Sequence, residues 1–241
     1  MNIFKRIKSL VIILLIIVSA TSCLDMKENE ETVYGDAFIR ATQLTETTVG
    51  YNLELFAYSM SEMSQVETYH DQSSLNITLQ SVSDNYTFAY QPSETVYSEE
   101  LPVSGIYFFD ATFANGAFYH GSDFLMTTHI DPPKIKKIEW NNEDKNVTIE
   151  WVKDEKAHLY RVTLLDENGK IAFESDLLEN TISDLWISQF TQGWYTNRKP
   201  ASTTTYTVLV SSYLFEPVVS TFDIQCIATN GLQKFVWNLE Q

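Results

Sequence analysis

Apolar and polar residues alternate along many short segments of this chain, and turn-forming residues separate the segments. A period of two places successive side chains on opposite faces of a β-strand, so that one face can be buried. The chain is rich in Tyr, Phe, Thr and Val, which favour strands, and its Asn-Gly pairs suit tight hairpin turns. The clearest alternating segments are residues 75–80, 146–151, 160–164 and 222–228. The pattern predicts an all-β protein built of antiparallel β-sandwiches.

One continuous apolar run, Leu10 to Val18, departs from this alternation. Three basic residues precede it, and small residues follow it as far as Cys23. A basic head, a short apolar middle and small residues are typical of a secretory signal peptide. The run is too short to span a bilayer, which requires ~20 apolar residues. Residues 1–22 are therefore predicted to be removed on export.

The residues Ala20, Thr21, Ser22 and Cys23 resemble the lipobox of bacterial lipoproteins, although that family usually has leucine where Ala20 stands. The resemblance implies that Cys23 carries lipid, begins the mature chain and holds it at a membrane. The alternative is an ordinary signal peptide cut nearby, with Cys23 as a free thiol. Cys226 is the only other cysteine, so lipidation of Cys23 would leave it without a disulfide partner.

An acidic segment follows Cys23, from Leu24 to Glu31. It has little to bury, so residues 23–34 are predicted to form a flexible linker. In Bacteroidetes-type lipoproteins, a similar acidic cluster accompanies display on the outer leaflet of the outer membrane. This resemblance implies a location at the cell surface. The alternative is a solvated spacer on a protein that faces the periplasm.

The net charge narrows the range of partners. The full chain has 16 basic and 32 acidic residues. Removal of residues 1–22, which contain three basic and no acidic residues, leaves a net charge of −19. Such a charge opposes binding to nucleic acid and to anionic lipid headgroups. We expect no nucleic-acid partner, and membrane attachment only through lipid on Cys23.

Pro132 and Pro133 stop sheet pairing between two strand-rich halves. They predict one sandwich over residues 35–131 and another over residues 132–241. The halves also share a faint repeat at an offset of 115 residues, and we favour structural repetition over convergence. The repeat matches Pro102, Tyr107, Phe109, Ala111, Asn115 and Gly116 with Pro217, Phe222, Ile224, Cys226, Asn230 and Gly231.

The second half resembles a fibronectin type III domain. Trp151 ends an alternating segment as the core tryptophan of that family does, and residues 222–230 resemble its sixth strand. The resemblance implies a seven-stranded sandwich, in which Phe222 replaces the usual tyrosine and the corner hydrogen bond is missing. Residues 206–210 could be the fifth or the sixth strand. The first half looks more generally immunoglobulin-like, and its Tyr107 keeps the hydroxyl.

Catalytic motifs are scarce. The four histidines do not have metal-ligand spacing, and the chain has no nucleophile elbow, phosphate loop or calcium loop. The segment from His120 to Asp123 could bring imidazole and carboxylate together on one turn, but solvated loop polarity is the favoured interpretation. Cys226 alternates with Ile224 and Ala228 and is predicted to be a small core residue. We expect no enzyme activity, no metal and no cofactor.

An aromatic insertion between residues 174 and 205 interrupts the strand pattern. Ser183 or Asp184 could cap a short helix that Gly193 ends. Trp186, Trp194 and Tyr195 are candidates for stacking on sugar rings. The alternative is a small core that packs the insertion onto the sandwich. We favour this core for Trp186, whereas both alternatives stay open for Trp194 and Tyr195.

Two functions follow. The first is a surface lipoprotein that acts as a non-catalytic binding module, with a polysaccharide as a plausible ligand. The second is a structural or adhesive subunit of a cell-surface assembly with protein partners. A fold of this kind hosts many functions and does not decide between them.

Overall fold

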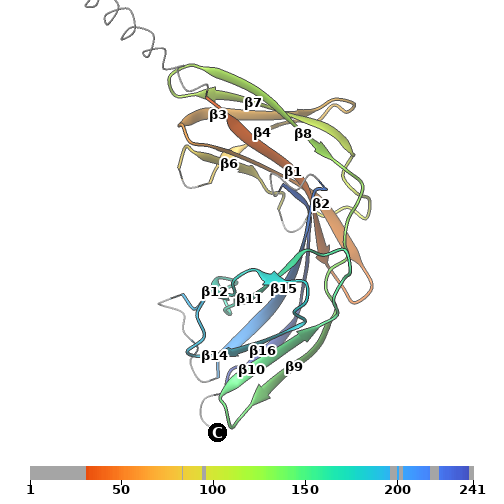
Figure 1. Ribbon diagram of the computed structural model, residues 1–241, viewed down its shortest axis with the longest axis vertical. Coiled ribbons are helices and arrows are strands. Elements are labelled where there is room, and N and C mark those ends of the chain that lie inside the picture. Colours follow the sequence, from red (N-terminus) through yellow and green to blue (C-terminus); the bar gives the residue numbers. More distant parts are fainter. Residues whose placement is uncertain are drawn as a thin grey trace, which may run out of the picture.

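The computed structural model describes residues 31–82, 84–93, 96–195, 200, 203–217 and 223–238 (Figure 1). These residues form sixteen β-strands and no helix, which confirms the all-β prediction. None of the described residues therefore forms a helix able to cross a membrane. The predicted leader, the lipidation site Cys23 and Phe222 lie outside the described residues.

The first eight strands form a sandwich of two sheets. One sheet has the order β1-β2-β6-β5, and the other has the order β4-β3-β7-β8. The strands are β1 (Val33–Gln43), β2 (Val49–Ser59), β3 (Met63–His70), β4 (Asn76–Thr78), β5 (Gln80–Ser81), β6 (Thr87–Tyr90), β7 (Gly105–Phe113) and β8 (Phe118–Leu125).

The last eight strands form a second sandwich. Its sheets have the orders β14-β10-β9 and β12-β11-β15-β16, and β13 pairs with β11. The strands are β9 (Ile135–Asn141), β10 (Asn146–Trp151), β11 (Leu159–Leu165), β12 (Ile171–Glu174), β13 (Leu178–Glu179), β14 (Asp184–Ser188), β15 (Thr205–Phe215) and β16 (Ile224–Val236).

Each sandwich buries the apolar residues that the alternation marks. Every second residue of β7 is buried, and β15 shows the same alternation. Trp151 is 0% exposed and its ring lies 5.6 Å from that of Tyr160, as a core tryptophan requires. Burial of one such side chain contributes about 1.5–3 kcal/mol. Cys226 is also 0% exposed, so its predicted place in the core is confirmed.

Apart from the two-residue strands β5 and β13, the strand order of the first half recurs in the second half, eight strands later. The structural equivalent of β7 is therefore β15, which is the sixth main strand of its sandwich when the two-residue strand β13 is set aside. The repeat at an offset of 115 residues is wrong in its register, because it matches β7 with the strand β16. Residues 206–210 belong to the sixth strand, and the segment that resembled the sixth strand is the seventh.

The corner tyrosines support this equivalence. The Tyr107 hydroxyl on β7 donates to the Val103 carbonyl at 2.7 Å, as expected. In the second half the equivalent residue is Tyr206 on β15, which is 2% exposed and hydrogen-bonds to the Thr204 side chain. The prediction that the second half lacks a corner hydroxyl is therefore wrong, since Tyr206 provides it.

A parallel strand pair joins the two sandwiches. In β1, Ile39 to Thr42 pair in register with Cys226 to Thr229 of β16. One nine-stranded sheet consequently runs through both halves. Strands of this shared sheet border the space between the halves on both sides (Figure 1). The two predicted sandwiches are present, but their strands are not all antiparallel.

The predicted helix near Ser183 to Gly193 is wrong. Residues 184–188 form the strand β14, which pairs with β10. Leu185 and Ile187 lie opposite Ile149 and Val147 in this pairing. The segment follows a period of two because its alternate apolar side chains complete the core of an existing sheet.

Candidate functional site

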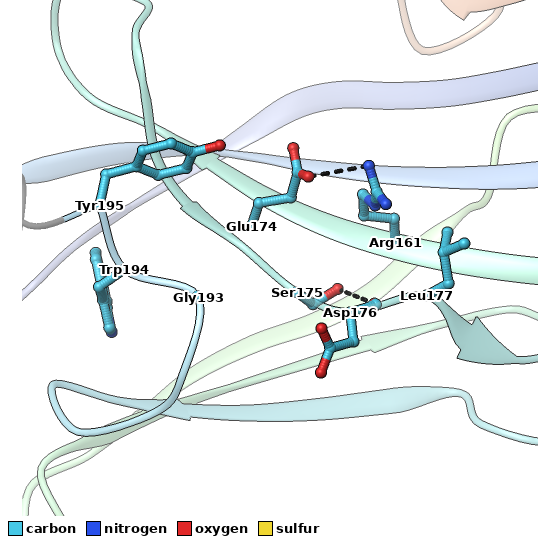
Figure 2. Close-up of a pocket in the computed structure, with 8 residues that line it drawn as sticks. All are labelled: Arg161, Glu174, Ser175, Asp176, Leu177, Gly193, Trp194 and Tyr195. Atoms are coloured by element: carbon cyan, nitrogen blue, oxygen red, sulfur yellow. Dashed lines mark hydrogen bonds and ion pairs between the residues drawn. The ribbon is translucent and has the colours of Figure 1, made fainter. Parts of the chain in front are cut away.

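The three candidate aromatic residues do not form one site. Tyr195 is 49% exposed and lines a groove, whereas Trp194 is half-buried beside it. Trp186 is 52% exposed on β14 and does not line this groove. Figure 2 shows the rings of Trp194 and Tyr195 on opposite sides of the backbone, as expected for neighbours in an extended segment.

The groove has a volume of about 580 Å³ and lies where β12 ends. One wall is the segment that leaves β12, and the other wall is the returning segment that contains Tyr195 (Figure 2). Its lining combines one exposed aromatic ring, one cation and two carboxylates with small and apolar groups. The lining residues are Arg161, Glu174, Ser175, Asp176, Leu177, Gly193, Trp194 and Tyr195.

Backbone hydrogen bonds hold the returning segment against β12. The Glu174 N–H donates to the Gly193 carbonyl at 3.0 Å, and the Tyr195 N–H donates to the Ala172 carbonyl at 2.9 Å. Gly193 has a φ of 116°, which favours glycine, and an added Cβ would clash with the Glu174 carbonyl oxygen. The groove wall is thus an ordered part of the sandwich edge.

The groove contains one ion pair. The Arg161 guanidinium lies 2.9 Å from the Glu174 carboxylate, and both side chains are about 30% exposed. Arg161 Nε is buried and has no hydrogen-bond partner within the described residues. Asp176 adds a second carboxylate to the groove. Such a site offers fixed donors and acceptors beside an aromatic ring, without a large excess of charge.

Trp194 serves the core. Its ring lies 5.2 Å from Phe173, 5.3 Å from Trp237 and 5.8 Å from Tyr206. Its indole N–H donates to the Ser188 carbonyl at 2.8 Å, which ties the returning segment to β14. Of the two alternatives for Trp194, the structure supports the packing role.

Trp186 and Phe190 contradict the predicted small core. Trp186 lies opposite Thr148 on the outer face of the sheet, and Phe190 is 86% exposed. Leu185 and Ile187 are the residues of this segment that turn inward, and Ile187 is 0% exposed. The period of two decides this outcome, because it sends Trp186 away from the apolar neighbours that suggested burial.

The histidines take local roles. His120 lies on β8, and its Nδ1 is 2.6 Å from the Asp110 carboxylate of β7. Its partner is therefore Asp110 and not Asp123, and the two residues lie on paired strands and not on one turn. His70 is 4% exposed, and its ring contacts Tyr107 and the Ser104 carbonyl. Across the described part of the chain, no group of three His, Cys, Asp or Glu side chains could hold a metal ion.

Burial makes Cys226 unreactive. Its thiol is enclosed by the core, and this burial raises its pKa to about 11. A thiol with such a pKa stays protonated at neutral pH and is a poor nucleophile.

Two groove residues, Arg161 and Glu174, were not expected from the sequence. Arg161 stands between Tyr160 and Val162 in an alternating segment, so its outward direction could have been read from the period of two. Its ion pair with Glu174 could not, because the pair depends on the β11–β12 pairing. Basic residues are uncommon in this acidic chain. The outward position of Arg161 on a strand is therefore the signal that could have identified it as a candidate site residue.

Comparison with known proteins finds no matching family model and no curated protein with significant similarity. Similar solved structures include proteins with fibronectin type III domains. The FN1–FN3 domains of chicken CNTN1 are 12% identical, with a TM-score of 0.32, and the match covers 84% of this chain and 67% of that chain.

A two-domain fibronectin type III segment of chicken tenascin is 11% identical, with a TM-score of 0.29 and coverage of 84% and 99%. The BSP domain of a biofilm-associated protein is 10% identical, with a TM-score of 0.24 and coverage of 86% and 29%. TM-scores this low carry no functional conclusion, and the strand pairing alone defines the fold described above.

Proposed function

We propose that this chain is a non-catalytic binding protein of the cell envelope that holds a glycan in the groove beside Tyr195. The observation that carries the proposal is the exposed Tyr195 ring next to the Arg161–Glu174 ion pair. An aromatic face can pack on the C–H face of a sugar ring. Fixed polar groups beside it can bond the sugar hydroxyls and orient the ligand.

Retention on polysaccharide gels tests the groove. Native gels are cast with a neutral polysaccharide that retards the wild-type protein. We expect Tyr195→Ala to abolish this retardation. Phe118→Ala is the matched control, because Phe118 is a 65% exposed aromatic residue on β8, in the other half of the chain. Equal retardation of wild type and Tyr195→Ala would exclude the groove as the glycan site.

We further propose that lipid on Cys23 anchors the chain in the outer membrane and that the sandwiches face outward. The support is the leader, the lipobox-like residues and the acidic linker. Protease treatment of intact cells, followed by blotting, tests the orientation. Loss of the mature chain while a periplasmic marker survives supports surface display. Protection until lysis would place the sandwiches in the periplasm.

The edge of β14 favours a second candidate function, a structural or adhesive subunit. Within the described residues β14 pairs only with β10, so its other edge is free. Trp186 and Phe190 expose aromatic surface at this edge, at 52% and 86%. A free edge with exposed aromatics suits a protein partner that adds a strand. Crosslinking on cells should then trap a partner in wild type but not in Trp186→Ser/Phe190→Ser.

A further inference from the structure

The shared sheet carries a row of polar residues across the junction of the two halves. Arg161 of β11 lies opposite Ser211 of β15, which lies opposite Thr229 of β16. Thr229 in turn lies opposite Thr42 of β1. These four residues, here called the polar strip, stand in register on four neighbouring strands that belong to both halves of the chain.

The alternation of each strand places the polar strip on the outer face of the shared sheet. The neighbours Val162, Ser212, Ala228 and Ala41 are each 0% exposed and turn into the sandwiches. The strip residues are half-buried, and they point the opposite way. The hydroxyls of Ser211 and Thr229 are 2.8 Å apart, which confirms that they share one face.

A second row flanks the polar strip. Tyr213, Ile227 and Arg40 lie in register on β15, β16 and β1. Burial raises the pKa of Tyr213, and Arg161 and Arg40 act in the opposite direction, so both guanidinium groups lie near the phenol. Tyr213 thus lies on the same face as both guanidinium groups.

The charges of this face neutralise one another. Arg40 donates two hydrogen bonds to the Glu54 carboxylate, at 2.9 and 2.8 Å. Arg161 pairs with Glu174 at 2.9 Å. The face thus offers hydroxyls and paired charges, whereas the mature chain as a whole carries −19. A neutral ligand rich in hydroxyls matches this surface, and a polyanion would be repelled.

A protein partner fits the polar strip less well. Of the large apolar residues on this face, Phe38 and Ile227 are only 7% and 6% exposed, and Leu159 and Leu209 are half-buried. The centre of a protein–protein interface is usually built of accessible aromatic and apolar side chains. Most of the partly accessible groups of this face are instead polar: small hydroxyls, a phenol and two guanidinium groups.

The polar strip is continuous with the groove, because Arg161 belongs to both, and its ion-pair partner Glu174 also lines the groove. Neighbouring strands lie ~4.8 Å apart, so the four steps from β12 to β1 span ~19 Å. A disaccharide would occupy only the groove end of such a face. A longer chain could reach from Tyr195 to Arg40.

We propose that the groove and the polar strip form one extended site, in which a neutral glycan chain lies across the shared sheet and contacts both halves. This inference rests on the proposed function. It adds that the glycan is neutral, that it runs across the strands of the shared sheet, and that the residues of the polar strip contact it. The parallel pairing of β1 with β16 creates the site, because it brings Thr42 and Arg40 beside Thr229.

A size ladder of neutral oligosaccharides tests the proposal. The probes are cello-, laminari- and manno-oligosaccharides from disaccharide to octasaccharide, titrated by calorimetry into the full mature chain with Cys23→Ser. We expect affinity to rise at least tenfold from the shortest to the longest member of the series that binds. Ser211→Ala/Thr229→Val should remove that gain and leave binding of the short members unchanged.

Two controls separate the outcomes. Thr112→Val removes a half-buried hydroxyl from β7, in the other sheet of the first half, and should keep the tenfold gain. In wild type, amide NMR signals of Thr42 and Thr229 should shift with long probes only, which requires no variant to fold. Binding that Tyr195→Ala abolishes but that does not change with chain length would overturn the polar strip and keep the groove. No binding of any probe would overturn the proposed function and this inference together.

Discussion

Neighbouring residues of this chain perform different tasks because an extended backbone sends successive side chains apart. Trp194 joins the aromatic core around Phe173 and Trp237, whereas Tyr195 faces the groove. A double replacement of Trp194 and Tyr195 would therefore confuse loss of fold with loss of binding. The two residues have to be tested separately.

We expect Trp194→Ala to lower the free energy of unfolding by about 2–4 kcal/mol, since it removes a packed ring and leaves the Ser188 carbonyl without its donor. Tyr195→Ala should change it by less than ~0.5 kcal/mol, because its ring is exposed. Urea unfolding followed by tryptophan fluorescence and circular dichroism measures both values. Equal losses for the two variants would contradict the division of tasks.

Gly193 is the second residue on which the groove depends. Gly193→Ala should destabilise the chain by more than ~1 kcal/mol, because its φ is 116° and the new methyl group would meet the Glu174 carbonyl. Gly116→Ala is the matched control: its φ is 86°, but nothing lies within 4 Å of the added Cβ. Thermal unfolding should show the larger loss for Gly193→Ala. The opposite order would argue against the tight returning wall.

At the scale of elements, the two halves repeat one strand order, and β7 and β15 occupy the same place in it. Tyr107 and Tyr206 lie near the start of these strands and are 1% and 2% exposed. Each hydroxyl is bonded to a residue a short way upstream. The equivalence is thus visible in packing and hydrogen bonding as well as in strand order.

We expect Tyr107→Phe and Tyr206→Phe each to cost about 0.5–1.5 kcal/mol of unfolding free energy, because each removes one buried hydrogen bond without leaving a cavity. Chemical denaturation measures the two losses. Tyr34→Phe is the control, since Tyr34 is 66% exposed. A negligible effect at both buried sites, equal to that of the control, would show that the corner bonds contribute nothing.

At the scale of the whole molecule, the junction gathers four carboxyl groups from both halves. Asp36 of β1 and Asp123 of β8 face Glu216 and Asp223, which flank the β15–β16 connection. Burial, and then the neighbouring carboxylates, raises the pKa of Asp36 to about 8, although the Ile224 N–H partly opposes this. Burial and the same neighbours raise the pKa of Glu216 to about 7. Protonation of Asp36 and Glu216 therefore stabilises the folded state at this junction.

The stability of the chain should consequently fall as pH rises. Below about pH 4 the folded and unfolded states both hold these protons, and the contribution is fully present. As pH rises toward about 8, the unfolded chain releases protons that the folded chain retains, so the contribution is lost. Asp36→Asn stays neutral and should reduce this fall, which urea unfolding at about pH 5 and about pH 9 measures. An identical fall in wild type and variant would contradict a protonated Asp36.

Local chemistry alone determined much of this protein. The period of two predicted the strands around Val147, Tyr160 and Ile224, because a strand must turn one face toward a core. The same rule predicted burial of Trp151 and Cys226. Applied to the segment where a helix was expected, it would also have predicted the exposure of Trp186. The net charge follows from composition alone, and the leader and the lipid on Cys23 stay predictions.

Tertiary structure decided what joins distant segments. The pairing of β1 with β16 brings residues near 40 beside residues near 227, and no local pattern encodes a partner so far along the chain. The ion pairs Arg161–Glu174 and Arg40–Glu54, the groove and the acidic junction all follow from such pairings. Alternation states which face of a strand is buried, but the register and the partner strand depend on the packing of the complete chain.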